Sequence, residues 1–496
     1  MKSLFILLLC SFLFTQSFAQ KTSIKGHIPS MKGAVLSIKR PTQQFIKNVS
    51  EKIPTKVLIS QSGDFSIDAS FLNKEIAIIA IQDTLNNKDL FEQYFFISKG
   101  DNLVLTENAN KGIDISGIGA KHNQLREIPI RYTHDWIEQD SIPDRIFTIV
   151  NGFYEKDKRT IDSLVKIHKP STDFIEAWKY HLKYARLNSF YTIPGEIRIE
   201  RRDILERNKQ SWVDKLVLLQ NEATLSDEKA LVAPSYHGYL NVFIERKFTD
   251  LVDDYFFASP TFYQEWFDGD TLKADEAMRK DSYNQLKHKI IEKYFDGKVK
   301  EQMYAFLFDQ MILSENYTNL EPILNDFNRQ FPNSKFNAYF EAPLKAALEK
   351  LKNKLTDKML FLNDIKNWDT ILAHFKGKTV LLDMWGTWCA PCREDLNLHA
   401  AQLKKHFKDK DVSFLYIANY DNNKEKLENV IAFYNLEGSH IQASRDLTTE
   451  IMQKINAESY PTYVIIDKYG KVELSRTQSP MQREALIQQI EEVLRR

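Results

Sequence analysis

Residues 377–393 decide the fold of the C-terminal part of the chain, and they read GKTVLLDMWGTWCAPCR. The largely apolar run Thr379–Trp385 predicts a buried β-strand. A helix is expected to begin at Ala390, because apolar residues follow it at helical spacing. Cys389 and Cys392 therefore stand at the point where a strand ends and a helix begins.

This position suits the chemistry of disulfide exchange. The thiolate, and not the thiol, attacks a disulfide. Unpaired amide groups and the positive end of the helix dipole stabilise a thiolate at Cys389. Two intervening residues put Cys392 one helical turn further along on the same side, from which it can attack a mixed disulfide. Pro391 costs little there, because the first helical turn does not need its N–H group.

The same stretch closely resembles the active-site segment of the TlpA/ResA-like thiol–disulfide oxidoreductases, which have the thioredoxin fold. The resemblance covers residues 359–496, and it implies that Cys389 is the attacking cysteine and Cys392 the resolving one. It also implies that Pro461, in Tyr460-Pro461-Thr462, is a cis-proline beside the cysteines, and that electrons come from a membrane thiol donor. We expect the substrate to contact Trp388, Tyr460 and Thr462, although simple packing of the ring explains Tyr460 equally well.

Two acidic residues are candidates for proton handling. Asp383 stands where classical thioredoxins carry a buried aspartate, and a buried carboxyl with a raised pKa can take the proton from Cys392 during resolution. The alternative is a buried carboxylate whose hydrogen bonds are satisfied and which has no catalytic role. The related oxidoreductases carry Glu three positions after the second cysteine and Pro two further on, where this chain has Asp395 and Asn397. Because Asp is shorter than Glu, we do not expect its carboxylate to reach the cysteines, and we expect Asp395 to be a solvated helix residue and not a catalyst.

Length and composition bound the remaining possibilities. The chain has 496 residues, which is too long for one ordinary domain. Hydrophobic residues make up 43% and charged residues 27%, as in globular proteins. Lys+Arg and Asp+Glu both number 67, and this neutral balance gives no support to nucleic-acid binding.

The pattern of apolar residues divides the chain after its N-terminal segment into three predicted domains. Residues 20–120 contain short β-like segments separated by turns, which is typical of a small β-sandwich. Residues 121–358 carry apolar positions at helical spacing, as at 236–243, and predict an all-α domain. Residues 359–496 alternate between strands and helices, which predicts a layered α/β domain; the resemblance makes it thioredoxin-like.

Residues 1–19 are expected to be a secretory signal peptide. Lys2 precedes an apolar core, and Ser17-Phe18-Ala19 has small residues at the −3 and −1 positions of a cleavage site. This core is shorter than the roughly 20 residues that span a membrane, and we expect no span after signal cleavage. Cys10 lies inside the core without small residues before it, so a lipid anchor is not expected. We therefore predict a soluble, exported protein of the periplasm with two cysteines.

These observations favour a periplasmic thiol–disulfide oxidoreductase, acting as a reductase on protein or small-molecule disulfides of the envelope. The redox group is then the Cys389–Cys392 pair itself, and we expect no metal and no further cofactor, since two cysteines are too few for a four-cysteine zinc site. A binding or scaffold protein, whose first two domains recruit a partner, is the second hypothesis. A thiol peroxidase is less favoured, because Thr387 stands two residues before Cys389 where peroxiredoxins place Thr three before.

Overall fold

The computed structural model describes residues 21–49, 55–84, 86, 88–124, 129, 131–132, 142–196, 202–477 and 479–496. The expected signal peptide and Cys10 lie outside these residues. The chain forms two compact units, and the boundary between them falls in the sequence between Arg246 and Lys247. Each unit is described by itself. The domain boundaries expected at residues 120 and 358 stay predictions.

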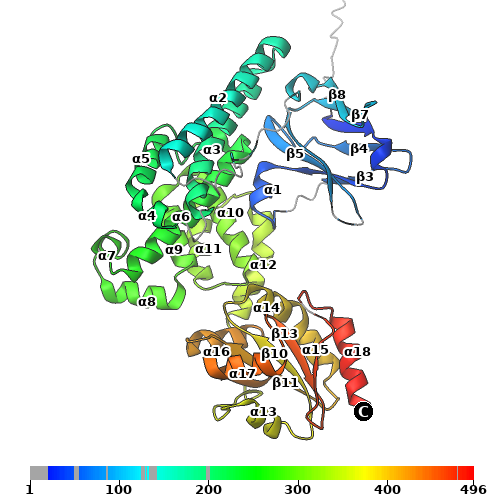
Figure 1. Cartoon of the computed structure of the whole chain (residues 1–496), viewed down its shortest axis with the longest axis vertical. Coiled ribbons are helices and arrows are strands. Elements are labelled where there is room, and N and C mark those ends of the chain that lie inside the picture. The colour runs from blue at the N-terminus through cyan, green and yellow to red at the C-terminus, as the bar shows by residue number, and fades with distance from the viewer. Residues whose placement is uncertain are drawn as a thin grey trace, which may run out of the picture. The chain divides into compact units, whose positions relative to one another are not determined.

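The first unit begins with strands, which Figure 1 shows in blue and cyan. They are β1 (Ser23–His27), β2 (Val35–Lys39), β3 (Lys56–Leu58), β4 (Asp64–Asp68), β5 (Glu75–Gln82), β6 (Asp89–Ile97), β7 (Asn102–Glu107) and β8 (Ile113–Ile118), with the short helix α1 (Pro41–Phe45) after β2. Among the described residues they form two four-stranded sheets, in the orders β4-β1-β7-β8 and β3-β2-β5-β6. β1 runs parallel to β7, and the other neighbours are antiparallel.

Both sheets contribute to one hydrophobic core. Strand β4 buries Phe65 and Ile67 in this core and exposes Ser66 between them, which is the alternation of a strand with one solvent face. Strand β5 instead is buried from residue 75 to residue 81. Its Ile79 faces the core between the sheets, whereas Ile76 packs against helices. The continuous apolar run in the sequence thus reflects burial on both faces of this strand.

Helices follow the strands. In the first unit they are α2 (Pro143–His168), α3 (Thr172–Glu196), α4 (Arg202–Arg207), α5 (Lys209–Gln220) and α6 (Pro234–Phe256), the last of which continues past residue 246. A hydrophobic cluster joins Ile76 and Phe96 of the sheet to Phe174 and Trp178 of α3. The rings of Phe96 and Phe174 lie 5.6 Å apart, nearly perpendicular to each other. The apolar positions expected on a helix at 236–243 are buried on α6, as predicted.

The second unit contains a run of helices followed by a mixed sheet. The helices are α7 (Pro260–Phe267), α8 (Thr271–Asp281), α9 (Asn284–Tyr294), α10 (Gly297–Leu313), α11 (Leu320–Gln330) and α12 (Asn337–Lys350). Strands and helices then alternate: β9 (Met359–Phe361), α13 (Trp368–His374), β10 (Thr379–Trp385), α14 (Ala390–Asp395), α15 (Ala401–His406), β11 (Val412–Asn419), α16 (Lys424–Phe433), β12 (Gly438–Ala443), α17 (Arg445–Lys454), β13 (Thr462–Ile466), β14 (Val472–Leu474) and α18 (Arg483–Leu494). No helix of the described residues is long and apolar enough to cross a membrane.

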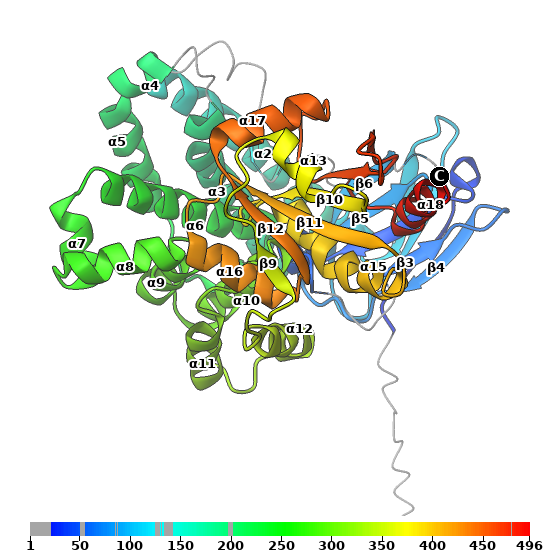
Figure 2. The ribbon, with the colours of Figure 1, turned by 90° about the horizontal axis from the view of Figure 1, so that it is seen from below.

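The six strands of this mixed sheet have the order β14-β13-β10-β11-β12-β9. Strand β10 lies between β11, to which it is parallel, and β13, to which it is antiparallel. Helices cover both faces of the sheet (Figure 2). Leu382 and its alternate neighbours pack with α13 and α17, while Asp383 points to the face covered by α14 and α15. Strand β10 is therefore buried throughout, as its sequence predicts.

The helix expected to begin at Ala390 is present, with one difference. Residues Leu396–Ala400 form a π-helical turn between α14 and α15. Such turns are rare and are found mostly at functional sites. The apolar side chains that follow Ala390 fit the spacing of an ordinary α-helix, so the sequence contains no sign of this turn.

Candidate active site

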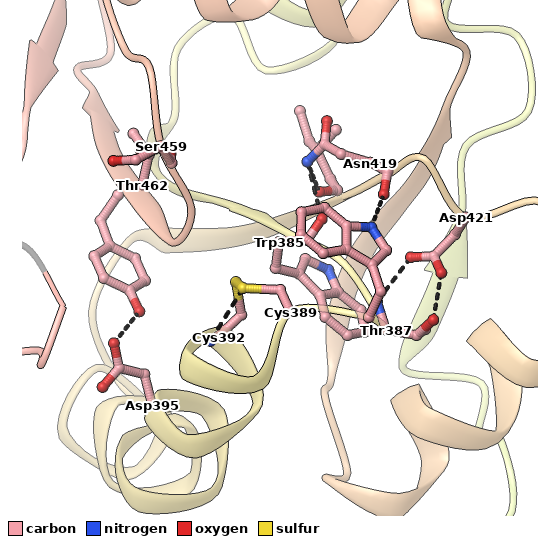
Figure 3. The surroundings of a disulfide bond; sticks show 12 residues. Trp385, Thr387, Cys389, Cys392, Asp395, Asn419, Asp421, Ser459 and Thr462 are labelled. Atoms are coloured by element: carbon pink, nitrogen blue, oxygen red, sulfur yellow. Dashed lines mark hydrogen bonds between the residues drawn. A yellow bond between two sulfur atoms is a disulfide. The ribbon is translucent and has the colours of Figure 1, made fainter. Parts of the chain in front are cut away.

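Cys389 and Cys392 form a disulfide at the start of α14 (Figure 3). Their Cα atoms lie 5.3 Å apart. Cys389 is the N-cap of the helix, and its Sγ accepts a hydrogen bond of 3.3 Å from the backbone N–H of Cys392. Cys389 is 4% exposed and Cys392 1% exposed. The helix thus directs an amide group at the sulfur that is expected to attack, and both cysteines are buried.

A buried carboxylate holds the loop between β10 and α14. Thr387 donates two hydrogen bonds to Asp421, one from its backbone N–H at 2.9 Å and one from its hydroxyl. Burial raises the pKa of Asp421, and the two hydrogen bonds from Thr387 act against this rise. Asp421 therefore holds Thr387, two positions before Cys389, in place.

Asn419 holds the same loop from the end of β11. Its side-chain amide donates to the backbone carbonyl of Trp385 at 2.9 Å, and its backbone carbonyl accepts from the indole N–H of Trp388 at 2.8 Å. Gly386 lies between these contacts, and a Cβ there would approach the Trp388 Nε1 atom to 2.5 Å and the Asn419 carbonyl oxygen to 3.0 Å. Glycine thus allows the close approach of the loop to both groups.

The sequence analysis missed Asn419 and Asp421, although one signal could have found them. Strands β10 and β11 are parallel, and Trp385 pairs with Ala418. Residues directly after the two strands therefore meet at one edge of the sheet, as is usual for the carboxyl ends of parallel strands. Polar residues immediately after the second buried strand were the available clue.

Three aromatic rings form a cluster beside the cysteine loop. Trp388 is 50% exposed, and its ring lies 5.5 Å from that of Tyr460, nearly perpendicular to it. Tyr420 is 46% exposed, with its ring 6.3 Å from Trp388 and 6.5 Å from Tyr460. Its backbone is left-handed, with φ of 56°, which is unusual for a bulky residue. The structure brings together the predicted contacts Trp388 and Tyr460, and it adds Tyr420, which the sequence analysis did not single out.

Pro461 stands directly before β13, and the peptide bond between Tyr460 and Pro461 is cis. Because Thr462 pairs with Met384 near the end of β10, Pro461 lies at the edge of the sheet from which the cysteine loop departs. The Thr462 side chain is buried, and its hydroxyl donates to the carbonyl of Ser459 at 2.7 Å. A cavity of about 300 Å³ is lined in part by Pro461 and Thr462.

Asp383 is buried on the face of the sheet that α14 and α15 cover. Its Oδ1 atom has no hydrogen-bond partner among the described residues. Burial raises the pKa of Asp383 well above its ordinary value, and the negative charge of Asp395 raises it further. The environment therefore favours the protonated carboxyl at this position.

The prediction that Asp395 is a solvated residue is wrong. Asp395 is 2% exposed, and it accepts hydrogen bonds from the Tyr463 hydroxyl at 2.8 Å and from the Met481 backbone N–H at 3.1 Å. Strand β13 and the segment before α18 supply these donors, so its burial depends on contacts distant in sequence. Asp383 and Asp395 both line a cavity of about 20 Å³, which is large enough for one water molecule.

Within the described part of the chain, no group of three or more His, Cys, Asp or Glu side chains could hold a metal ion. The redox-active groups that the structure places at this site are the two sulfurs. Around them lie a helix N-terminus, two buried carboxyl groups on one side and an exposed aromatic cluster on the other.

Comparison with known proteins supports this assignment of chemistry. The Redoxin family model matches residues 353–493. The thiol–disulfide oxidoreductase ResA of Bacillus thuringiensis subsp. konkukian (strain 97-27) is 30% identical over 131 residues, which are 26% of this chain and 73% of that protein. The chain belongs to the TlpA/ResA-like family of thiol–disulfide oxidoreductases. ResA of Bacillus subtilis (strain 168) is 32% identical over 101 residues, covering 20% of this chain and 54% of that protein.

As a ResA-like protein, the chain is a thioredoxin-like oxidoreductase, and its C-terminal part has the thioredoxin-like fold. Among solved structures, a thioredoxin family protein from Chlorobium tepidum TLS is 22% identical, with a TM-score of 0.22 and coverage of 25% of this chain and 84% of that chain. The thioredoxin domain of a thiol–disulfide oxidoreductase from Bacteroides vulgatus is 21% identical, with the same TM-score and coverage. The Redoxin match begins at residue 353, after the helices and the N-terminal sheets.

Proposed function

We propose that this ResA-like protein is an exported reductase of disulfides in periplasmic and other envelope proteins, with Cys389 and Cys392 as its redox pair. The observation that carries the proposal is the Cys389–Cys392 disulfide at the N-terminus of α14, in a chain that belongs to a family of thiol–disulfide oxidoreductases. The amide groups at a helix N-terminus stabilise a thiolate, which is the species that attacks a disulfide.

The proposed reaction begins with both cysteines reduced. The Cys389 thiolate attacks one sulfur of the substrate disulfide and forms a mixed disulfide, and the released substrate thiolate takes a proton. The Cys392 thiolate then attacks Cys389, which releases the second substrate thiolate and closes the Cys389–Cys392 disulfide. Two electrons pass from the pair to the substrate. A membrane thiol donor returns two electrons and regenerates the dithiol.

Two features near the pair support particular roles in this reaction. Asp383 is buried and its pKa is raised, so its ionised form is a stronger base than an ordinary carboxylate and is suited to accept the proton of Cys392 as this cysteine becomes a nucleophile. The exposed rings of Trp388 and Tyr420, together with Tyr460, offer an apolar surface for a polypeptide around the substrate disulfide. Pro461 and Thr462 directly follow Tyr460 in the chain, and we assign them to the same substrate site, although their side chains are buried and line a separate cavity.

The reduction potential of the pair tests the proposal most directly. The mature full-length protein is equilibrated in thiol redox buffers, and the free thiols are trapped and counted. A potential near the thioredoxin value of about −270 mV supports a reductase, whereas one near about −120 mV makes the protein a disulfide donor and reverses the proposed direction. If the pair does not cycle between disulfide and dithiol, the proposal fails and a binding or scaffold role replaces it.

A further inference from the structure

A buried polar network connects the helix that carries Cys392 to the loop between α10 and α11 in the same unit. Arg393 directly follows Cys392, and its guanidinium donates to the backbone carbonyl of Glu315. The same guanidinium contacts the Tyr434 hydroxyl through Nε at 3.4 Å, and this hydroxyl donates to the Glu315 carboxylate at 3.4 Å. Arg393, Glu315 and Tyr434 are each less than one-tenth exposed.

The same loop binds this helical segment a second time, one turn further on. The side-chain amide of Asn397 donates to Glu315 Oε1 at 3.0 Å. Its carbonyl oxygen accepts from Lys350, the last residue of α12, at 2.6 Å. Residues four apart lie on one side of a helix, so Arg393 and Asn397 present one polar face to Glu315. Glu315 thus contacts α14 and the π-helical turn that follows it.

The partners of Glu315 offset a burial that is otherwise costly for a carboxylate. A buried carboxylate is costly unless it is paired and hydrogen-bonded. Burial raises the pKa of Glu315, and the charges of Lys350 and Arg393 together with its hydrogen bonds act against this rise. Glu315 also has a left-handed backbone, with φ of 51°, which residues other than glycine rarely adopt and which is concentrated at functional sites.

We propose that Glu315 is a positioning residue for the redox pair, which holds α14 through Arg393 and the π-helical turn after it through Asn397, and which balances the charge of Arg393, the residue that follows Cys392 in the sequence. This inference rests on the proposed function, because it requires that the pair cycles between disulfide and dithiol. It assigns the helices before residue 353 a part in the redox chemistry, since Glu315 lies outside the Redoxin match.

The charges around the pair determine the direction of the effect. A neighbouring cation stabilises thiolates, and stabilising the reduced form makes a pair more oxidising. Arg393 and Lys350 are the cations of the network, and Glu315 and Asp421 are the carboxyl groups that interact with Arg393. Removing the Glu315 charge leaves Arg393 less balanced, so the pair becomes more oxidising. Removing the Lys350 charge has the opposite effect and makes the pair less oxidising.

The test compares the equilibrium constant of the pair with glutathione in the mature full-length protein and its variants at pH 7. Glu315→Gln keeps the side-chain shape and an acceptor oxygen but loses the charge. We expect it to favour the dithiol about threefold, which equals about 14 mV at 29.6 mV per tenfold change. Lys350→Gln is expected to favour the disulfide by a smaller factor. If Glu315→Gln does not fold, this variant still tests whether the charges of the network set the equilibrium of the pair.

Glu292→Gln is the matched control. Glu292, on α9, binds Tyr304 and Gln330 within the helices, away from this network, so its loss should leave the equilibrium constant unchanged. A folded Glu315→Gln variant with the wild-type constant overturns the inference, as does a Lys350→Gln shift of the same sign as that of Glu315→Gln. If the wild-type pair itself does not cycle, the proposed function fails instead, so the two failures are distinguishable.

Discussion

Replacing Asp383 by Asn tests whether the buried carboxyl holds a proton in the folded protein. The side chain lies under α14 and α15, and its Oδ1 has no hydrogen-bond partner among the described residues. Asn has nearly the same shape and no charge at any pH. The variant therefore removes the proton equilibrium of this site and leaves the packing around it largely unchanged.

The sign of the effect follows from the direction of the pKa shift. The pKa of Asp383 is raised well above 3.8, first by burial and then by the charge of Asp395. Between the unfolded and the folded pKa, the folded protein holds a proton that the unfolded chain has lost. The stability of the wild type therefore falls by about 1.4 kcal/mol for each pH unit in this range. The advantage of the Asn variant grows at the same rate and becomes constant above the folded pKa.

Hydrogen exchange of the oxidised full-length protein, followed by mass spectrometry between pH 5 and pH 8, measures the difference in stability between the wild type and the Asn variant in the segments around residue 383. Peptides from β10 and β13 report the opening of the sheet that contains Asp383. Peptides from β5, which belongs to the other unit, are an internal control and should exchange alike in both proteins once the intrinsic rates are corrected for pH.

A difference in opening free energy that stays constant from pH 5 to pH 8 would refute the reasoning. It would mean that Asp383 holds no extra proton in this range, and its role as proton acceptor for Cys392 would fall with it. Asp395→Asn is the companion variant. Because it removes the charge that raises the pKa of Asp383, the pH at which the fall in stability ends should be lower than in the wild type.

Three further changes test the site. Cys392→Ser should stop turnover in an insulin reduction assay and accumulate mixed disulfides on non-reducing gels; normal turnover would exclude Cys392 as the resolving residue. Thr387→Val removes the hydroxyl that donates to buried Asp421 and should lower the free energy of unfolding by about 1–3 kcal/mol. Unaltered hydrogen exchange in α14 peptides would contradict this cost. Tyr420→Ala should raise KM for a protein disulfide about threefold, since an aromatic contact contributes roughly 0.5–1.5 kcal/mol. With a small aromatic disulfide as the substrate, kcat of the Tyr420→Ala variant should not change. An equal loss of activity with both substrates would argue against a role of Tyr420 in recognition.

Local patterns were sufficient to predict the strand that leads to the cysteines. The expected bounds 379–385 coincide with β10. This strand is a short, largely apolar run, so the signal lies within a few residues. The pairing of β10 with its neighbours and the helices that cover each face of the sheet are set by contacts between distant segments, which a single sequence does not display.

The polar partners of the site also come from distant parts of the chain, so the sequence does not reveal them. Asp421 is 34 residues from Thr387, Glu315 is 78 from Arg393, and Met481 is 86 from Asp395. The error about Asp395 arose because its role was judged from the length of its side chain, by comparison with Glu. Its position was more informative, because a residue three after Cys392 shares the helix face of that cysteine. A carboxylate on the buried face of a helix requires donors from another segment, and here they are the Tyr463 hydroxyl and a backbone amide. Helical spacing from the resolving cysteine therefore predicts the burial of Asp395, whereas the identity of its donors follows only from the fold.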